Sequence, residues 1–270
     1  MEFTKKSLGQ HWLHDETALN HICDRSNLSQ DDTVLEIGPG TGTLTAKLLK
    51  RGAKVVAVEK DETLAAKLHN LRVRPVDSTG RTRRRQLSVV EGDILQFDLT
   101  RLPADYKVVA NIPYYLTSNL LRYLSESINP PSLMVLLLQK EVAQRIAVQP
   151  GQMSLLSVSV QLYYEPELGR IIPARLFTPP PKVDSQVVIL RRLPVTRIIL
   201  VANEVDGFMK VVKAGFSQRR KKLRSSLSGG LGITKEQADD LLKKAGINPN
   251  TRAQELSLQE WYKLCKKLIG

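Results

Sequence analysis

The sequence predicts an α/β protein with a mostly parallel sheet and an antiparallel edge, followed by a small domain made only of helices. In the first two-thirds of the chain, short β-rich runs alternate with helical patterns, which is the order of repeated βαβ units. A glycine-rich turn follows the first of these runs, where such sheets place ligand-binding turns. Beyond Leu193 and Pro194 helical periodicity takes over. We therefore expect one domain over residues 1–194 and a second over residues 195–270.

The β-rich runs of the first domain define the expected sheet. Five of them should form its parallel strands, at residues 33–37, 54–59, 87–91, 106–111 and 133–139. Helices with apolar residues at i, i+3 and i+4 should connect them, at residues 43–50, 61–71, 118–125 and 140–148. Two later runs, 155–164 and 186–191, have no helical pattern between them. We expect these two to pair antiparallel at one edge of the sheet.

The second domain shows helical spacing of its apolar residues. Phe208, Val212 and Phe216 lie on one stripe, and further pairs follow at Leu223 with Leu227 and at Leu241 with Leu242. Gly229, Gly230 and Gly232 predict a turn inside this domain, and residues 246–249 predict another.

Positive charge is concentrated in this second part. The 270 residues include 40 Lys and Arg against 27 Asp and Glu, a net charge of +13, of which +10 falls after residue 190. This balance favours a polyanionic partner. No acidic residue occurs between Gly207 and Leu227, whereas an ordinary solvated helix mixes charges of both signs. We therefore expect an RNA-facing cluster at Arg219, Arg220, Lys221, Lys222 and Arg224, although a merely solvated face is the alternative.

Several classes of protein do not fit the composition. No run approaches the roughly 20 apolar residues of a membrane helix, and the N-terminal ten residues lack the apolar core of a signal peptide. Cys23 and Cys265 are the only cysteines, which indicates reduced thiols, and neither has metal-ligand spacing. We expect a cytoplasmic protein without a metal. Residues 72–86 carry six arginines and predict an exposed loop without an assigned role.

The glycine-rich turn spans Glu36 to Gly42 and reads Glu-Ile-Gly-Pro-Gly-Thr-Gly. Glycine lets a backbone turn sharply and approach a ligand closely, although a simple tight turn has the same composition. A nicotinamide fingerprint requires a third glycine at position 43, where this chain has Thr43. The spacing therefore disfavours a dehydrogenase.

Two carboxylates follow the next strands at the same end of the expected sheet. Glu59 lies 19 residues after Gly40, where an acid can accept hydrogen bonds from both ribose hydroxyls of an adenosine. Asp93 follows the third strand, where a helix N-cap is the structural alternative. Together with the glycine turn they predict a site for an adenosine.

The fourth strand ends in Asn111-Ile112-Pro113-Tyr114, the most specific motif of the chain. A turn is its structural alternative. The exocyclic amino group of adenine is a poor nucleophile, because its lone pair is delocalised into the ring. An Asn side-chain oxygen and a backbone carbonyl can accept its two hydrogens and favour a tetrahedral nitrogen. Pro113 stiffens the backbone, and Tyr114 offers a face on which an extruded base can stack.

These residues resemble the class I S-adenosylmethionine-dependent methyltransferases with a Rossmann-like sheet, and specifically the family of ribosomal RNA adenine dimethyltransferases. The resemblance covers nearly the whole chain. Besides the motifs above, it includes an N-terminal signature, a proline-rich late motif, a basic segment that should be helical and a closing helix pair, at residues 6–13, 177–185, 216–224 and 252–257. Trp12 stands where the family usually has Phe.

The resemblance implies roles for individual residues. The residues implied to hold S-adenosylmethionine are His11, Leu13, Gly38, Gly40, Glu59, Asp93 and Asn111. Those implied at the reacting centre are Asn111, Pro113, Tyr114 and Phe177, with Tyr114 and Phe177 on either side of the target base. It further implies dimethylation of two adjacent adenosines near the 3′ end of 16S rRNA in a 30S precursor, by a monomer.

Two alternatives remain open at this point. One is the related group of methyltransferases that modify large-subunit rRNA and confer macrolide resistance, which shares the glycine-rich and Asn-Ile-Pro-Tyr motifs. The other is a non-catalytic nucleic-acid-binding factor on the same fold. Residues 182–185 and 216–227 favour the small-subunit enzyme over the first alternative. The intact motif at residues 111–114 and the expected absence of a transit segment disfavour the second.

Overall fold

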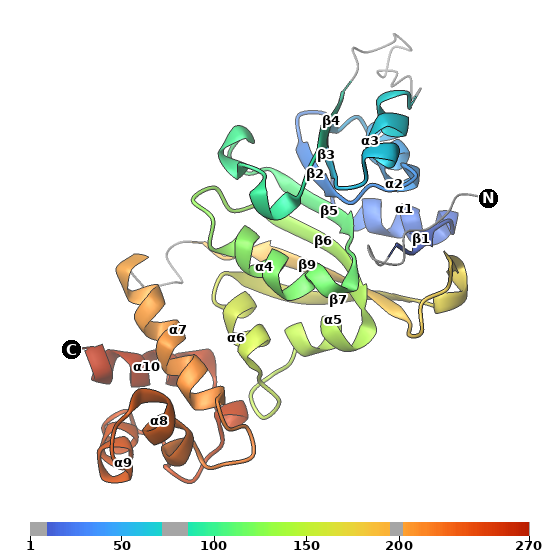
Figure 1. Ribbon diagram of the computed structural model, residues 1–270. Helices are drawn as coiled ribbons and strands as arrows, with labels where there is room; N and C mark the ends of the chain where they lie inside the picture. Colours follow the sequence, from blue (N-terminus) through green and yellow to red (C-terminus); the bar gives the residue numbers. More distant parts are fainter. Residues whose placement is uncertain (1–9, 72–85, 195–201, 270) are drawn as a thin grey trace. The chain divides into compact units, whose positions relative to one another are not determined.

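A computed structural model describes residues 10–71, 86–194 and 202–269 of the protein (Figure 1). The chain forms two compact units, Met1–Ala143 with Glu165–Arg192, and Gln144–Tyr164 with Leu193–Gly270. The division differs from the predicted boundary at residue 194, because residues 144–164 group with the C-terminal helices. The arginine-rich segment predicted to be an exposed loop falls, apart from Gln86, outside the described residues.

The first unit contains a seven-stranded sheet with the strand order β4-β3-β2-β5-β6-β9-β7. Its strands are β2 (Thr33–Ile37), β3 (Lys54–Glu59), β4 (Leu87–Glu91), β5 (Lys107–Asn111), β6 (Leu133–Gln139), β7 (Tyr164–Ile172) and β9 (Ser185–Arg192). Strands β2 to β6 pair in parallel, and β9 pairs antiparallel with β6. The predicted fold class is confirmed, and the predicted parallel strands match within one residue.

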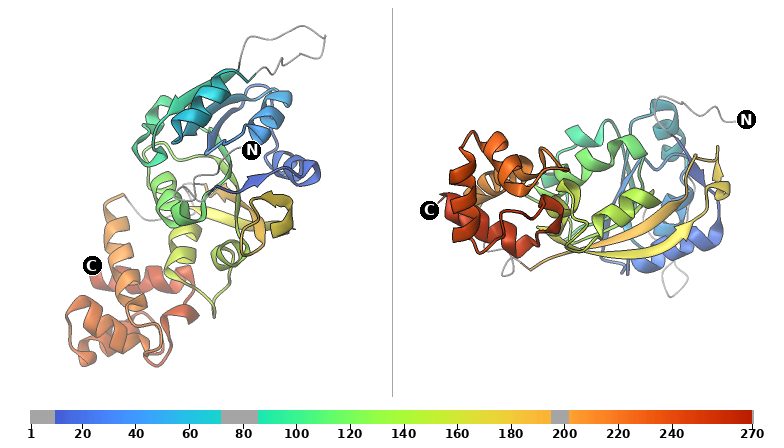
Figure 2. Two further views of the ribbon diagram at one scale, coloured as in Figure 1. Left: turned by 45° about the vertical axis from the view of Figure 1, so that its right-hand side comes forward. Right: turned by 90° about the horizontal axis from the view of Figure 1, so that it is seen from below.

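Helices and short elements complete this unit. They are α1 (Glu16–Arg25), α2 (Thr43–Lys50), α3 (Glu62–His69), α4 (Thr117–Ser125), the two-residue strands β1 (Trp12–Leu13) and β8 (Phe177–Thr178), and the 3₁₀ turns η2 (Ile94–Gln96), η3 (Leu99–Arg101), η4 (Tyr114–Leu116) and η5 (Ala174–Leu176). Helix α5 (Lys140–Ile146) begins in this unit and ends in the second. Helices α1 and α4 lie on opposite faces of the sheet (Figure 2). The strands β1 and β8 form a separate antiparallel pair.

Alternation along the strands decides which side chains face α1 and α2. Val34, Val55 and Val109 join one buried cluster with Leu19 and Ile22 of α1. Leu35 and Val108, one residue away on their strands, are fully buried as well. A central strand buried on both faces reads as a continuous apolar run, which explains why these strands were predictable from sequence.

The expectation of a strand at residues 155–164 is wrong. Residues Leu155–Gln161 form the helix α6, which begins with a capping box between Ser154 and Ser157. Val158 and Leu162 are buried in the core of the second unit, four residues apart as on one helix face. The edge strand is β7, whose Pro166 and Gly169 and alternating charged residues concealed it from the sequence pattern.

The second unit packs its helices around Trp261, which is fully buried. Besides α6 it contains α7 (Ala202–Phe216), α8 (Leu223–Leu231), α9 (Lys235–Lys244), the 3₁₀ turn η7 (Ala253–Glu255) and α10 (Leu258–Ile269). Phe208, Val212 and Leu223 are buried in its core, as their spacing predicts. Residues 217–222 lie outside the helices, so the basic segment is an interhelical turn and not the continuous helix expected.

Gly229 and Gly230 lie inside α8 rather than in the predicted turn, and Gly232 caps the helix in the left-handed conformation. Tertiary packing explains Gly230. A Cβ on this residue would lie 2.6 Å from the Cα and Cβ atoms of Ala214, so α7 and α8 cross where only glycine fits.

Candidate functional site

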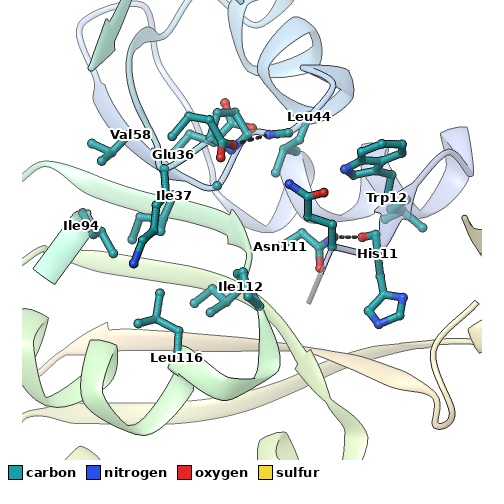
Figure 3. A pocket seen from close by; sticks show the side chains of 18 of the residues that line it. His11, Trp12, Glu36, Ile37, Leu44, Val58, Ile94, Asn111, Ile112 and Leu116 are labelled. Atoms are coloured by element: carbon teal, nitrogen blue, oxygen red, sulfur yellow. Dashed lines mark hydrogen bonds between the residues drawn. The ribbon is translucent and has the colours of Figure 1, made fainter. Parts of the chain in front are cut away.

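A pocket of about 220 Å³ lies at the carboxyl ends of the parallel strands of the first unit. It is found between β2 and β5, where the strand order reverses and open α/β sheets bind their ligands. Nine residues predicted from the sequence line it, namely His11, Leu13, Gly38, Gly40, Glu59, Asp93, Asn111, Pro113 and Tyr114. Ile94 and Val58 lie toward one end, and His11 and Trp12 toward the other (Figure 3).

The glycine-rich turn joins β2 to α2 through three residues with positive φ, Gly38 at 62°, Gly40 at 58° and Gly42 at 83°. A Cβ on Gly40 would lie 3.1 Å from Nε1 of Trp12. Gly40 is therefore required both by its backbone conformation and by the close approach of the indole. The turn keeps its backbone exposed to the pocket.

Glu59 ends β3 and is 5% exposed. Its Oε2 accepts a hydrogen bond from the Gly40 amide at 3.0 Å, and its Oε1 accepts one from the Asp61 amide at 2.9 Å. Burial raises the pKa of Glu59, and these two hydrogen bonds oppose the shift. Each carboxylate oxygen has a second lone pair, so both can still accept a ribose hydroxyl. Glu59 thus fixes the glycine turn and faces the pocket.

Asp93 caps the 3₁₀ turn η2 and also lines the pocket. Oδ1 accepts a hydrogen bond from the Leu95 amide at 3.0 Å, and Oδ2 accepts one from Nζ of Lys60 at 2.8 Å. The Lys60 ammonium holds the pKa of Asp93 below its ordinary value. Lys60, which the sequence analysis missed, also lines the pocket. Its position directly after Glu59 was the available signal.

Asn111 ends β5 with its side-chain amide in a defined orientation. Nδ2 donates to the backbone carbonyl of His11 at 2.9 Å (Figure 3). An amide whose nitrogen donates to the protein keeps its oxygen as a free acceptor. The arrangement therefore suits a ligand that brings an N–H group into the pocket.

Tyr114 follows on η4, and its ring is held by two contacts. The His11 ring stacks against it, with centroids 5.8 Å apart and an angle of 27° between the planes. The Tyr114 hydroxyl lies 2.9 Å from Oγ of Ser185. His11 is itself held, because its Nδ1 lies 2.7 Å from the carbonyl oxygen of Pro179.

Phe177 is placed elsewhere. It pairs with Leu13 in the β1–β8 ladder, is 4% exposed and joins the hydrophobic core of the first unit. The structure therefore does not bring it to the pocket with Tyr114. Strand pairing of residues 177–178 with residues 12–13 turns the Phe177 ring inward.

Glu36 lines the same pocket and is 1% exposed. Burial raises its pKa to about 8, and the neighbouring Thr45 hydroxyl opposes part of this effect. Glu36 is the first residue of the glycine-rich motif, but its place in that motif did not predict a role for it. Tyr115 also lines the pocket with 59% of its surface exposed.

The predicted RNA-facing residues belong to the second unit. Arg219, Arg220, Lys221 and Lys222 are exposed on the turn between α7 and α8. Lys222 donates to Oδ1 of Asn250 at 2.8 Å, and Arg224 lies 3.4 Å from Oδ2 of Asp239. Four of the five cations, those at 219–222, are therefore exposed, whereas Arg224 lies in α8 and is half-buried.

No group of three or more His, Cys, Asp and Glu side chains among the described residues could hold a metal ion. None of the helices in the same part of the chain is long and apolar enough to cross a membrane. Cys23 and Cys265 are both buried and free.

Comparison with known proteins gives a consistent result. The family model of ribosomal RNA adenine dimethylase matches residues 1–269. Ribosomal RNA small subunit methyltransferase A of Dehalococcoides mccartyi (strain CBDB1) is 42% identical and covers 98% of this chain and 89% of its own length. The protein of that name from Rippkaea orientalis is 41% identical and covers 95% of this chain and 94% of its own length.

Solved structures agree in fold. A dimethyladenosine transferase from Plasmodium falciparum superposes with a TM-score of 0.75 at 25% identity, over 94% of this chain and 96% of the other. The 23S rRNA methyltransferase ErmE superposes with a TM-score of 0.71 at 26% identity, over 96% of this chain and all of the other.

Proposed function

This chain belongs to the ribosomal RNA adenine dimethylase family, and we propose that it dimethylates the exocyclic amino groups of two adjacent adenosines near the 3′ end of 16S rRNA. The curated relatives at about 40% identity are named for the small subunit, whereas the large-subunit enzyme ErmE is 26% identical. This difference supports the small-subunit substrate over the large-subunit alternative.

The pocket residues fit S-adenosylmethionine, the cofactor of this class of methyltransferase. Trp12 closely approaches Gly40, and the buried Glu59 carboxylate lies at the end of the neighbouring strand β3. These residues form a cofactor cradle that offers a carboxylate to a ribose. Glu59 would hold the ribose, and Asp93 the adenine amino group. His11, Leu13, Gly38 and Gly40 would hold the remainder. When bound, the cofactor supplies an electrophilic methyl group.

One observation carries the catalytic proposal, the 2.9 Å hydrogen bond from Asn111 Nδ2 to the His11 carbonyl. It leaves Oδ1 of Asn111 as an acceptor for one hydrogen of the target amino group. The backbone after Asn111, stiffened by Pro113, offers a carbonyl for the other. Orienting the amino group in this way frees its lone pair, and the Tyr114 ring stacks on the base. The rate of methyl transfer then depends chiefly on the positioning of the reactants.

The exposed cations at 219–221 support docking to an rRNA backbone, since phosphate contacts dominate the affinity of proteins for nucleic acids. We include in the proposal that the enzyme is a cytoplasmic monomer and that its substrate is rRNA within a 30S precursor. Phe177 remains a proposed residue of the reacting centre. This part of the proposal rests only on the resemblance of residues 177–185 to the family's late motif.

A methyl-transfer assay on undermethylated small subunits, run beside undermethylated large subunits, tests the substrate. Methylation of small subunits alone is expected. Asn111→Ala should abolish most transfer while cofactor-free thermal unfolding changes little, because Asn111 donates to a single backbone carbonyl. Transfer to large subunits alone would identify the macrolide-resistance activity, and transfer to neither would favour a non-catalytic RNA-binding factor.

A further inference from the structure

The late motif at residues 177–185 is not explained by the proposed chemistry, apart from Phe177. Its last residue, Ser185, begins β9 opposite Gln139, the last residue of β6. Ser185 is fully buried, and its Oγ lies 2.9 Å from the Tyr114 hydroxyl. These two residues are 71 positions apart in sequence, so only the fold brings them together.

Ser185 lies on a backbone that is held in place. The carbonyl of the preceding Asp184 accepts a hydrogen bond from the Lys140 amide at 2.9 Å. Oδ1 of Asp184 accepts another from the Ala174 amide at 2.9 Å. The serine hydroxyl therefore occupies a defined position relative to the ends of β6 and β9.

Tyr114, in contrast, follows Pro113 on a 3₁₀ turn outside the sheet ladder. Its ring is half-buried, and the His11 ring already contacts it. The hydroxyl at the far end of the ring is the atom that meets Ser185. Burial raises the pKa of Tyr114, and its phenol can donate or accept the hydrogen bond with the serine hydroxyl.

We propose that Ser185 is a positioning residue, which holds the Tyr114 ring through its hydroxyl so that the ring presents a fixed face to the target adenine. The inference rests on the proposed function. It adds a role for the hydroxyl to the expectation from the sequence, in which Tyr114 offers a stacking face.

A double-mutant cycle tests the inference. Ser185→Ala and Tyr114→Phe should each lower kcat/KM for undermethylated small subunits by roughly 3- to 10-fold, the effect of losing one hydrogen bond between neutral groups. Because both variants remove the same bond, the double variant should be no worse than either single variant. Tyr114→Ala, which also removes the stacking face, should lose far more. Cofactor affinity by calorimetry should stay unchanged in Ser185→Ala.

The matched control is Ser125→Ala. Ser125 is a buried serine of the same unit, 5% exposed, whose hydroxyl has no hydrogen-bond partner among the described residues. It should keep the wild-type kcat/KM. Losses that add in the Ser185 and Tyr114 double variant, or a Ser185→Ala variant with the wild-type kcat/KM, would overturn the inference.

Nuclear magnetic resonance of protein labelled with ¹³C at the tyrosine Cζ separates this inference from the proposed function. Tyr114→Phe identifies the Tyr114 resonance by its disappearance. Ser185→Ala should shift that resonance, whereas Ser125→Ala should not. An unmoved resonance overturns the positioning role even if the enzyme methylates small subunits. A wild-type protein that methylates neither subunit contradicts the proposed function, whatever the resonance does.

Discussion

Replacement of Glu59 by Gln tests the cofactor cradle at a buried carboxylate that holds the glycine-rich turn. The carboxylate bridges the Gly40 and Asp61 amides through hydrogen bonds of 3.0 and 2.9 Å. Gln keeps one accepting oxygen and turns an NH₂ group toward the other donor. One bond to a charged acceptor is therefore lost, which should cost about 1.5–3 kcal/mol of the free energy of unfolding.

The same substitution should weaken S-adenosylmethionine binding. If each carboxylate oxygen accepts one ribose hydroxyl, Gln retains one of these two bonds and loses the other. A loss of about 1.5–3 kcal/mol corresponds to a dissociation constant roughly 10- to 150-fold higher. Glu59→Ala would leave both backbone donors without an acceptor, so its folding defect would obscure its effect on binding.

Isothermal calorimetry with S-adenosylmethionine and urea unfolding measure the two effects. Glu91→Gln is the matched control, because Glu91 is the register partner of Glu59 on β4 and is exposed. It should change neither quantity. Unchanged cofactor affinity in Glu59→Gln, or tighter binding of a nicotinamide dinucleotide than of S-adenosylmethionine, would refute the cradle.

Three further predictions concern other parts of the chain. Replacing the two cations at 220–221 with Gln should flatten the log-log salt dependence of small-subunit binding by about two units, whereas the same change at the exposed lysines 243–244 should not. If filter binding gives the same slope for both variants, the cations at 219–222 are only a solvated face. Because burial raises the pKa of Glu36 from 4.5 to about 8, the folded state favours its protonated form, so wild-type stability should fall as pH rises from about 4.5 to about 8. Glu36→Gln should lose this part of the pH dependence of the free energy of unfolding, as measured by urea titration. A pH profile identical to that of the wild type would contradict the prediction. Gly230→Ala should lower the free energy of unfolding by about 1–3 kcal/mol through overpacking. Gly229→Ala, with room for a Cβ, should raise the free energy of unfolding by up to about 1 kcal/mol. The opposite order of melting temperatures would exclude the close crossing of α7 and α8.

The sequence by itself determined the parallel strands and the glycine-rich turn. Both depend on local causes, namely burial on two faces of a strand and the positive φ angles of a tight turn. The Asn-Ile-Pro-Tyr motif was predictable for a similar reason, since its chemistry lies within four consecutive residues. The carboxyl ends of parallel strands share one edge, so the sequence also indicated that Glu59, Asp93 and Asn111 meet there.

Only the tertiary structure decided the contacts between distant segments. Residues 155–161 alternate Val158 and Val160 with serines but form a helix, because Ser154 caps it and its apolar face packs into the second unit. Phe177 lies in the core because its strand pairs with the N-terminal segment. The bond between Tyr114 and Ser185 spans 71 residues and has no local signature. The periodicity of a sequence indicates which residues are buried. Which distant residue each of them contacts depends on how the whole chain folds.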